Sequence, residues 1–177
     1  MDASSAHQDT LPVTSDQMLD RLRAAGLAFE YYEHAVLRTV EDAKRIQGSV
    51  LPMEAGHIDV KNFYLRDRKK RNYLVVLEQD RTVDLKALGA QIGAGNVSFG
   101  SPERLMEYLG VRPGAVTPLA MVTGAAKGVR LYMDRAVERA AHIHVHPLVN
   151  DRTVTLRSCD LLSLLKTWGA TPVWLDL

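Results

Sequence analysis

The sequence predicts a single domain of the α/β (α+β) class, in which helices surround a mixed sheet or a partly closed barrel. Three observations predict it. The chain has 177 residues, within the ~100–200 that one hydrophobic core commonly serves. Hydrophobic residues make up 46% and charged residues 24%, which are ordinary globular values. Strand-like and helix-like segments mix along the chain without strict βαβ alternation, and no internal repeat is visible.

The first third is predicted to hold a tail, a helix, a strand and a second helix. We expect a disordered tail over residues 1–12 and the folded domain over residues 13–177. Thr14, followed by Ser15, Asp16 and Gln17, resembles a capping box, so the first helix begins there. Gly26 can adopt the left-handed conformation that ends it. The next elements are an aromatic-rich strand over residues 29–34 and a helix over residues 40–47, which Gly48 stops.

The middle of the chain is predicted to form a hairpin followed by two helices. The hairpin strands span residues 58–65 and 73–77, joined by residues 66–72. Residues 74–77 form a continuous apolar run, typical of a strand that is covered on both faces. The helices are predicted over residues 85–92 and 101–109. The second has Ser101 to cap it, Pro102 in its first turn and Gly110 to stop it.

The last third is predicted to be mostly strand. Four strands are expected over residues 119–123, 129–133, 142–146 and 153–157, and residues 172–175 close the sheet. Ser158 is expected to cap a helix that Gly169 ends.

Composition excludes several classes of protein. Lys plus Arg number 22 against 21 Asp plus Glu, and this net charge of +1 excludes a wholly basic surface but leaves room for a local basic patch. The only cysteine is Cys159, which excludes an intrachain disulfide and a cysteine-based zinc site. No apolar run reaches the ~18 residues of a membrane span, and the first ten residues lack signal-peptide features. We therefore expect a cytoplasmic protein with no membrane contact.

Three histidines alternate with apolar residues near the C-terminus. Strand periodicity puts His142, His144 and His146 on one face, and three imidazoles can hold a catalytic zinc ion. A flat strand spreads them over ~13 Å, so two of them, but hardly all three, can share one ion. The alternative is a strand with a polar face. Pro147 places His146 at a strand end, where a side chain can face a cleft.

Three further features can carry chemistry. Lys61 and Asn62 interrupt an apolar strand, and the ammonium either meets a phosphate or carboxylate or reaches water from a sheet edge. A glycine-containing turn can offer backbone N–H groups to an oxyanion, or it can be an ordinary turn; it consists of Gly114, Ala115, Val116, Thr117 and Pro118. A basic hairpin loop can contact nucleic-acid phosphates or form a solvated tip; its cations are Arg66, Arg68, Lys69, Lys70 and Arg71.

Several segments, in this order, resemble a known family: VKNFYLRD at 60–67, RNYLV at 71–75, SFGSPERL at 98–105, LGVRPGAVTP at 109–118 and HPLVN at 146–150. They resemble the YbaK-like editing domains, free-standing relatives of the insertion domain of bacterial prolyl-tRNA synthetase. The resemblance extends from about Thr14 to the C-terminus. The Lys61-Asn62 pair and the long hairpin are most similar to the free-standing ProX (ProXp-ala) type, which removes alanine from mischarged tRNA for proline.

The resemblance implies a strongly curved sheet of about seven strands and hydrolysis of the aminoacyl ester without metal, cofactor or side-chain nucleophile. Lys61 would anchor the phosphate of the terminal adenosine, and the amides near Gly114 would hold the ester carbonyl. A ribose hydroxyl would help to position the water. His146 would line the aminoacyl pocket, and Asn62 and Asn150 would orient the backbone around it. His142 and His144 lie outside the family pattern and are interpreted as structural.

The substrate and partners are predicted from the same resemblance. The predicted partner is the acceptor end of a mischarged tRNA, bound by a monomer, with prolyl-tRNA synthetase or an elongation factor as a further candidate. Two alternatives remain at this stage: a deacylase for cysteine or serine esters, and a tRNA-binding adaptor without catalysis. The histidine-based metal hydrolase ranks last.

Overall fold

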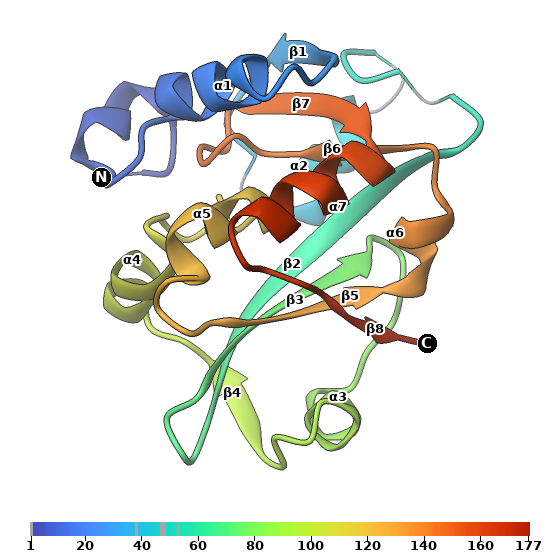
Figure 1. Cartoon of the computed structure of the whole chain (residues 1–177). Coiled ribbons are helices and arrows are strands. Elements are labelled where there is room, and N and C mark those ends of the chain that lie inside the picture. Colours follow the sequence, from blue (N-terminus) through green and yellow to red (C-terminus); the bar gives the residue numbers. More distant parts are fainter. Residues whose placement is uncertain (1, 38, 47–48, 53) are drawn as a thin grey trace.

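The computed structural model of the protein describes residues 2–37, 39–46, 49–52 and 54–177, and it shows one eight-stranded sheet (Figure 1). The strands are β1 (Phe29–Glu33), β2 (His57–Asp67), β3 (Asn72–Glu78), β4 (Val97–Phe99), β5 (Arg130–Asp134), β6 (His142–Val145), β7 (Arg152–Arg157) and β8 (Val173–Leu175). Their order is β1-β7-β6-β2-β3-β5-β8, with β4 on β2. The β2–β6, β3–β5 and β5–β8 pairings are parallel and the rest are antiparallel. The α+β class and the mixed sheet are confirmed, with eight strands in place of about seven.

Helices surround this sheet. They are α1 (Ser15–Ala24), α2 (Val40–Ile46), α3 (Leu85–Gln91), α4 (Pro102–Leu109), α5 (Met121–Gly124), α6 (Arg135–Arg139) and α7 (Ser158–Thr167), with the 3-10 turns η1 (Ser5–Thr10) and η2 (Pro118–Ala120). The capping box of Thr14 and Gln17 and the Ser101 cap form as predicted. The predicted stop of α2 at Gly48 lies outside the described residues. Within the described ranges, no helix is long and apolar enough to cross a membrane.

The central hairpin carries the core on both of its faces, as the apolar run predicts. Leu74 and Val76 of β3 belong to the larger core, whereas Val75 and Leu77 belong to a smaller core under α3. The strands extend further than predicted, so the connecting turn is only residues 68–71. Arg66 therefore lies within β2 and not in the loop.

The strand predicted over residues 119–123 is wrong, because this segment forms η2 and α5. Pro118 opens the turn, and the Thr117 hydroxyl accepts a hydrogen bond from the Leu119 N–H. This capping turns the chain into a helical path. Leu119 and Ala120 are fully buried, so the apolar run that resembled a strand is a buried helical turn.

Two further details differ from expectation at helix and strand boundaries. Ser158 does not cap α7, because β7 continues directly into the helix and Arg157 occupies the cap position. Strand β4 and helix α6 are absent from the predicted elements. They have only three and five residues, lengths at which periodicity gives little signal. Asp134 starts α6 by accepting a hydrogen bond from the Ala136 N–H.

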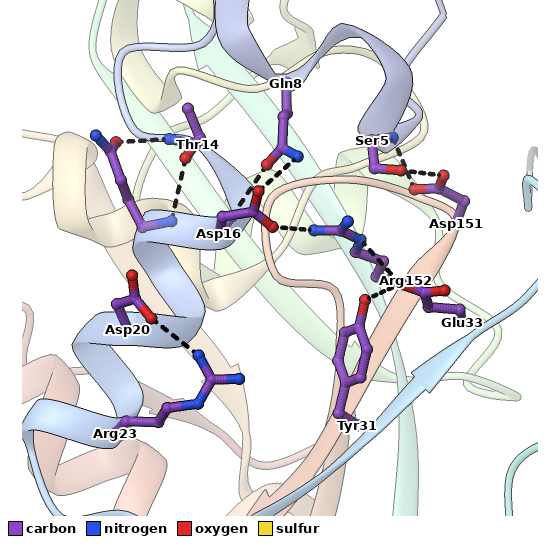
Figure 2. A network of polar contacts seen from close by, with 11 residues as sticks. Ser5, Gln8, Thr14, Asp16, Asp20, Arg23, Tyr31, Glu33, Asp151 and Arg152 are labelled. Atoms are coloured by element: carbon purple, nitrogen blue, oxygen red, sulfur yellow. Dashed lines mark hydrogen bonds and ion pairs between the residues drawn. The ribbon is translucent and has the colours of Figure 1, made fainter.

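The N-terminal segment, predicted to be a disordered tail over residues 1–12, is ordered over residues 2–12, which corrects that expectation. Its Ala3 and Leu11 are buried on either side of η1, which has no buried residue of its own. The Ser5 N–H and hydroxyl both donate to the Asp151 carboxylate, at 2.8 and 2.7 Å (Figure 2). Buried apolar groups and two charge-assisted hydrogen bonds fix a segment whose polar composition resembles a tail.

One edge of β2 is interrupted, and this interruption positions the candidate site. Strand β6 pairs with residues 57–59 and β4 with residues 65–67, so along this edge no described strand pairs with residues 60–64. The Tyr64 carbonyl accepts the Gly100 N–H on this side. Because backbone groups alternate in a strand, the N–H and C=O of Asn62 point into the same gap.

Candidate functional site

A pocket of about 240 Å³ opens at the interrupted edge of β2. Its lining comes from four parts of the chain: Leu37, Thr39 and Ala43 around α2, Val60, Lys61, Asn62 and Phe63 of β2, Gln79 after β3, and Gly114, Val116 and His146. Side chains from both faces of β2 border the pocket, because it lies at the strand edge and not on one face of the sheet.

The structure brings together the lysine, the asparagine, the glycine-containing turn and the histidine that the sequence predicts to be functional. Lys61, Asn62, Gly114, Val116 and His146 all line this pocket. The other four predicted binding residues, Ala115, Thr117, Pro118 and Asn150, are buried behind the lining. They shape the turn, whereas the five lining residues are the ones available to a ligand.

Lys61 presents a partly buried ammonium group at the pocket. Its Nζ donates a hydrogen bond to the Arg81 carbonyl oxygen, which leaves two N–H donors for an anion. Arg81 is held in place by an ion pair of 2.9 Å with Asp134. Burial raises the pKa of Asp134, but hydrogen bonds from Arg81 and from the Ala136 and Glu78 amides outweigh it, so its pKa is lowered. The acceptor for Lys61 is therefore anchored by a permanently charged pair.

Asn62 brings a buried acceptor to the pocket. Its Oδ1 atom has no hydrogen-bond partner among the described residues. A buried acceptor without a partner costs about 1–3 kcal/mol, so the site gains when a ligand donor reaches it. Its backbone N–H and C=O face the same gap, so Asn62 brings both a side-chain acceptor and backbone groups to the interrupted edge.

His146 is held as a neutral acceptor. Its Nδ1 lies 2.9 Å from the Arg152 carbonyl, and because a carbonyl only accepts, Nδ1 carries the proton. Nε2 is then the unprotonated nitrogen. Burial lowers the pKa of His146, more strongly than this hydrogen bond raises it. The imidazole is therefore neutral at pH 7, with a lone pair on Nε2.

The glycine turn offers two backbone donors. The Gly114 and Val116 N–H groups make no hydrogen bond to any described residue, whereas the Ala115 N–H donates to the Arg112 carbonyl. Pro118 has no N–H to give. Gly114 has a φ of +93°, and a Cβ there would lie 3.1 Å from Asn150 Nδ2. Glycine is thus required both by the backbone conformation and by the close approach of Asn150.

Asn150 supports the pocket wall from behind. Its Nδ2 donates to the Leu37 carbonyl at 2.9 Å, and its own carbonyl accepts the Leu37 N–H. Its backbone N–H donates to the Ala3 carbonyl. Asn150 therefore links the N-terminal segment, the Leu37 segment and the Gly114 turn, although it does not line the pocket.

Asp151 and the first residue of β7, Arg152, extend this support, as Figure 2 shows. Asp151 binds Ser5, and Arg152 forms an ion pair of 2.6 Å with Asp16 of α1. The Arg152 carbonyl also holds the His146 ring. The N-terminal segment and α1 thereby fix the strand that orients His146.

We expect Asp151→Ala to destabilise the protein by about 1–3 kcal/mol, because the Ser5 N–H and hydroxyl lose a charged acceptor. Urea unfolding monitored by circular dichroism measures this loss. Asp20→Ala is the matched control, since Asp20 forms an exposed ion pair with Arg23 (Figure 2), and such a pair contributes little to stability. Equal midpoints for the two variants would show that the N-terminal segment is not anchored through Asp151.

The basic hairpin divides into two groups. Arg68, Lys69 and Lys70 are exposed at the tip. Arg71 instead forms an ion pair of 2.6 Å with Asp67, whose side chain is 1% exposed. Arg71 therefore fastens the hairpin, and the exposed tip cations are the ones free to meet phosphate.

Three other histidines, His57, His142 and His144, form a separate group between β2 and β6. His57 Nδ1 lies 3.3 Å from His144 Nε2, and His144 Nδ1 lies 2.7 Å from the Thr155 hydroxyl. The His142 ring lies 4.9 Å from the His57 ring, centroid to centroid. Burial, aided by the charge of His57, lowers the pKa of His144 to about 4. In the part of the chain that the structure describes, no three His, Cys, Asp or Glu side chains are placed to hold a metal ion.

Sequence reasoning missed Leu37, Ala43, Gln79 and Arg81. Leu37 and Ala43 have no local signal, because only the fold brings their segment over the β2 edge. Gln79 has a weak one: it is a polar residue directly after the apolar run of β3, and it is buried. Arg81 is recognisable only through its contact with Lys61.

An ammonium group, two backbone amides without a partner among the described residues and two neutral acceptors thus surround one small pocket. The aminoacyl-tRNA editing domain family model matches residues 34–164. The chain belongs to this family, and it is an aminoacyl-tRNA deacylase, a hydrolase that acts on charged tRNA.

Particular relatives follow from the comparisons. The chain is 34% identical over 154 residues to the prolyl-tRNA editing protein ProX of Acetoanaerobium sticklandii, covering 86% of this chain and 89% of the relative. It is 31% identical over 165 residues to the prolyl-tRNA synthetase associated domain-containing protein 1 of Mus musculus, covering 90% and 94%. A crystal structure described as a trans-editing enzyme for prolyl tRNA synthetase has a TM-score of 0.63 at 21% identity, covering 92% of this chain and 97% of that one. The predicted family and fold are confirmed.

Proposed function

We propose that the protein hydrolyses, in trans, the ester that joins alanine to tRNA for proline. The observation that carries this proposal is that Lys61, Asn62, His146 and the free amides of Gly114 and Val116 surround one small pocket. A relative named as a prolyl-tRNA editing protein, 34% identical over most of both chains, supports the choice of tRNA. The reaction belongs in the cytoplasm, where tRNA is charged.

The phosphate of the terminal adenosine of the substrate lies at Lys61. Its two unused N–H donors meet the phosphate of the terminal adenosine, an interaction strengthened by charge. The ammonium is compact, and its hydrogen bond to the anchored Arg81 carbonyl fixes its position. It therefore holds the nucleotide in one place. Binding at this point brings the ester to the Gly114 turn, and such positioning supplies a large part of the rate.

The ester carbonyl lies at the glycine turn. As water attacks, charge develops on the carbonyl oxygen, and the Gly114 and Val116 N–H groups stabilise it without reorganisation. A neighbouring ribose hydroxyl of the substrate positions the water. Aminoacyl esters are activated, so positioning and oxyanion stabilisation suffice and no side-chain nucleophile is required.

The amino group of the substrate lies between two acceptors. The α-ammonium of alanine donates to the unpartnered Oδ1 of Asn62 and to the Nε2 of His146. Both are buried and neutral, so they bind a donor more favourably than exposed groups would. Asn150 acts through the backbone that it fixes and does not touch the substrate.

Pocket size supplies the selectivity. A synthetase site built for proline cannot strongly reject the smaller alanine, because one or two methylenes contribute only ~1–3 kcal/mol. A second, smaller pocket admits alanine and excludes proline. Leu37, Ala43 and Val116 form the apolar side of the pocket and are the residues that limit it.

The exposed cations Arg68, Lys69 and Lys70 of the hairpin tip are proposed to contact phosphates of the tRNA, together with Arg66. Prolyl-tRNA synthetase or an elongation factor is proposed to deliver the charged tRNA to this monomer.

The test of this proposal is a panel of esters on one tRNA. Tritium-labelled alanine, cysteine and serine are each attached to tRNA for proline, and release is measured under single-turnover conditions. Alanine is expected to be released at least tenfold faster than the others. Preference for cysteine or serine would assign another aminoacyl group, and tRNA binding with no release of any of the three would assign an adaptor.

The pH profile tests the state of His146. Because burial lowers its pKa, kcat/KM is expected to stay constant through the ordinary histidine range near pH 6.5 and to fall only at more acid pH, where Nε2 gains a proton. His146→Asn keeps a donor for the Arg152 carbonyl but removes the second nitrogen. It is expected to lower kcat/KM about tenfold and to remove the acid limb. A half-maximal rate near pH 6.5 in the wild type would contradict the neutral, buried state.

A further inference from the structure

Phe99 is the most exposed large apolar side chain in the described part of the chain, at 58%. It ends β4, where it pairs with Leu65 of β2, and the next residue donates its N–H to the Tyr64 carbonyl at 3.0 Å. A side chain on that residue, Gly100, would collide with the Tyr64 ring, so the strand lies flush against β2. The backbone that carries the exposed ring is thus held by strand pairing with β2.

An isolated exposed apolar side chain is ordinary, but this one is connected to the pocket. The Phe99 ring meets the Phe63 ring edge to face, with centroids 5.4 Å apart and an interplanar angle of 84°. Phe63 lines the pocket beside Lys61. Lys61 and Phe63 lie on one face of β2, about 6.6 Å apart along the strand. The Phe63 and Phe99 rings therefore lie in succession between the Lys61 ammonium in the pocket and the surface.

We propose that Phe99 is the stacking platform for the unpaired base that precedes the terminal adenosine of the RNA. The inference rests on the proposed function. Unpaired bases bind aromatic side chains by stacking, with little dependence on sequence. With the terminal phosphate at Lys61, the preceding nucleotide continues along β2 past Phe63 and places its base on the exposed face of Phe99.

The surrounding charge favours RNA as the occupant of this ring. Beyond the end of β2, the chain reaches the exposed Arg68 and Lys69 of the hairpin tip, whereas the side chain of Arg66 lies on the other face of the strand. A row of cations beyond a stacking ring suits the phosphates of a single strand. The ring, the phosphate-binding lysine and the cations thus follow one strand in the order in which an RNA 3′ end would meet them.

The test compares a substrate that has the preceding base with one that lacks it. Phe99→Ala is expected to raise KM for alanyl-tRNA about tenfold, the loss of one stacked base, with kcat within about twofold. Phe99→Trp is expected to restore KM. Hydrolysis of 3′-O-alanyl-adenosine 5′-monophosphate, which carries the same ribose ester but has no preceding base, is expected to be unchanged. Val173→Ala, at a residue 52% exposed on β8, is the control and leaves both substrates unaffected.

Several outcomes overturn this proposal while leaving the proposed function intact. They are an unchanged KM in Phe99→Ala, an equal loss on 3′-O-alanyl-adenosine 5′-monophosphate, which shows a structural role, and no rescue by tryptophan, which shows that stacking is not the contribution lost. If the wild type hydrolyses neither substrate, the proposed function fails, and RNA binding then tests the role of Phe99. Fluorescence anisotropy of a labelled single-stranded RNA ending in CCA is then expected to show tenfold weaker binding to Phe99→Ala, and equal binding overturns the platform.

Discussion

Replacing Lys61 with alanine is expected to lower kcat/KM for alanyl-tRNA about 100-fold while the fold survives. The Lys61 ammonium lines the pocket and is proposed to hold the terminal phosphate, and hydrogen bonds to charged groups contribute ~1.5–3 kcal/mol each. The side chain is only partly buried, and the hydrogen bond that its ammonium forms within the described residues is to the Arg81 carbonyl, so its removal costs little stability. The rate is measured with labelled alanyl-tRNA under single-turnover conditions, and folding by circular dichroism.

Lys166→Ala is the matched control for this prediction. Lys166 is exposed at the end of α7, so its removal takes the same charge from the protein at a distance from the pocket. It is expected to leave kcat/KM within about twofold. Equal rates for the two variants would show that Lys61 contributes only to the general attraction of tRNA.

Replacing Gly114 with alanine is expected to lower kcat by about 100-fold, the loss typical of one misplaced oxyanion donor. The new Cβ would lie 3.1 Å from Asn150 Nδ2 at a φ of +93°, so either the Asn150 amide or the turn that carries the Gly114 and Val116 amides must shift. Since the amides act on the charge that develops during attack, kcat falls more than binding does. Separate measurement of kcat and of tRNA affinity distinguishes the two.

Gly128→Ala separates the catalytic effect from backbone strain. Gly128 also has a positive φ, of +72°, but a Cβ there meets nothing within 4 Å. Both variants carry the ~1–2 kcal/mol strain of a left-handed alanine, and of the two only Gly114→Ala brings its Cβ into close contact with a neighbour, Asn150 Nδ2. The assignment of the Gly114 and Val116 amides as oxyanion donors fails if the two variants have the same kcat.

The elements with strong local signals were predictable from the sequence. The capping box at Thr14, the Ser101 cap with Gly110 and the apolar run of β3 each determine structure through their own residues. Residues 119–123 were misassigned because a short apolar run is equally compatible with a buried helical turn, and only the Thr117 cap decides. The ordered N-terminal segment depends on Asp151, which is distant in sequence.

The candidate site was predictable where a residue type breaks its surroundings. Lys61 and Asn62 stand out in an apolar strand, and His146 stands out before a proline. The interrupted edge of β2 was not predictable, because it results from where β4 and β6 stop pairing. For the same reason the sequence could not separate the amides of Gly114 and Val116, which are free, from that of Ala115, which is bonded within the turn.

The most direct test of the central claim is hydrolysis of alanyl-tRNA and prolyl-tRNA, both on tRNA for proline, by the purified protein with and without EDTA. The size-limited pocket and its own positioned groups predict rapid release of alanine, little release of proline, and the same rates with EDTA. Release of proline at a similar rate would contradict the size limit. Loss of activity in EDTA would contradict the assignment of catalysis to Lys61 and the Gly114 turn alone.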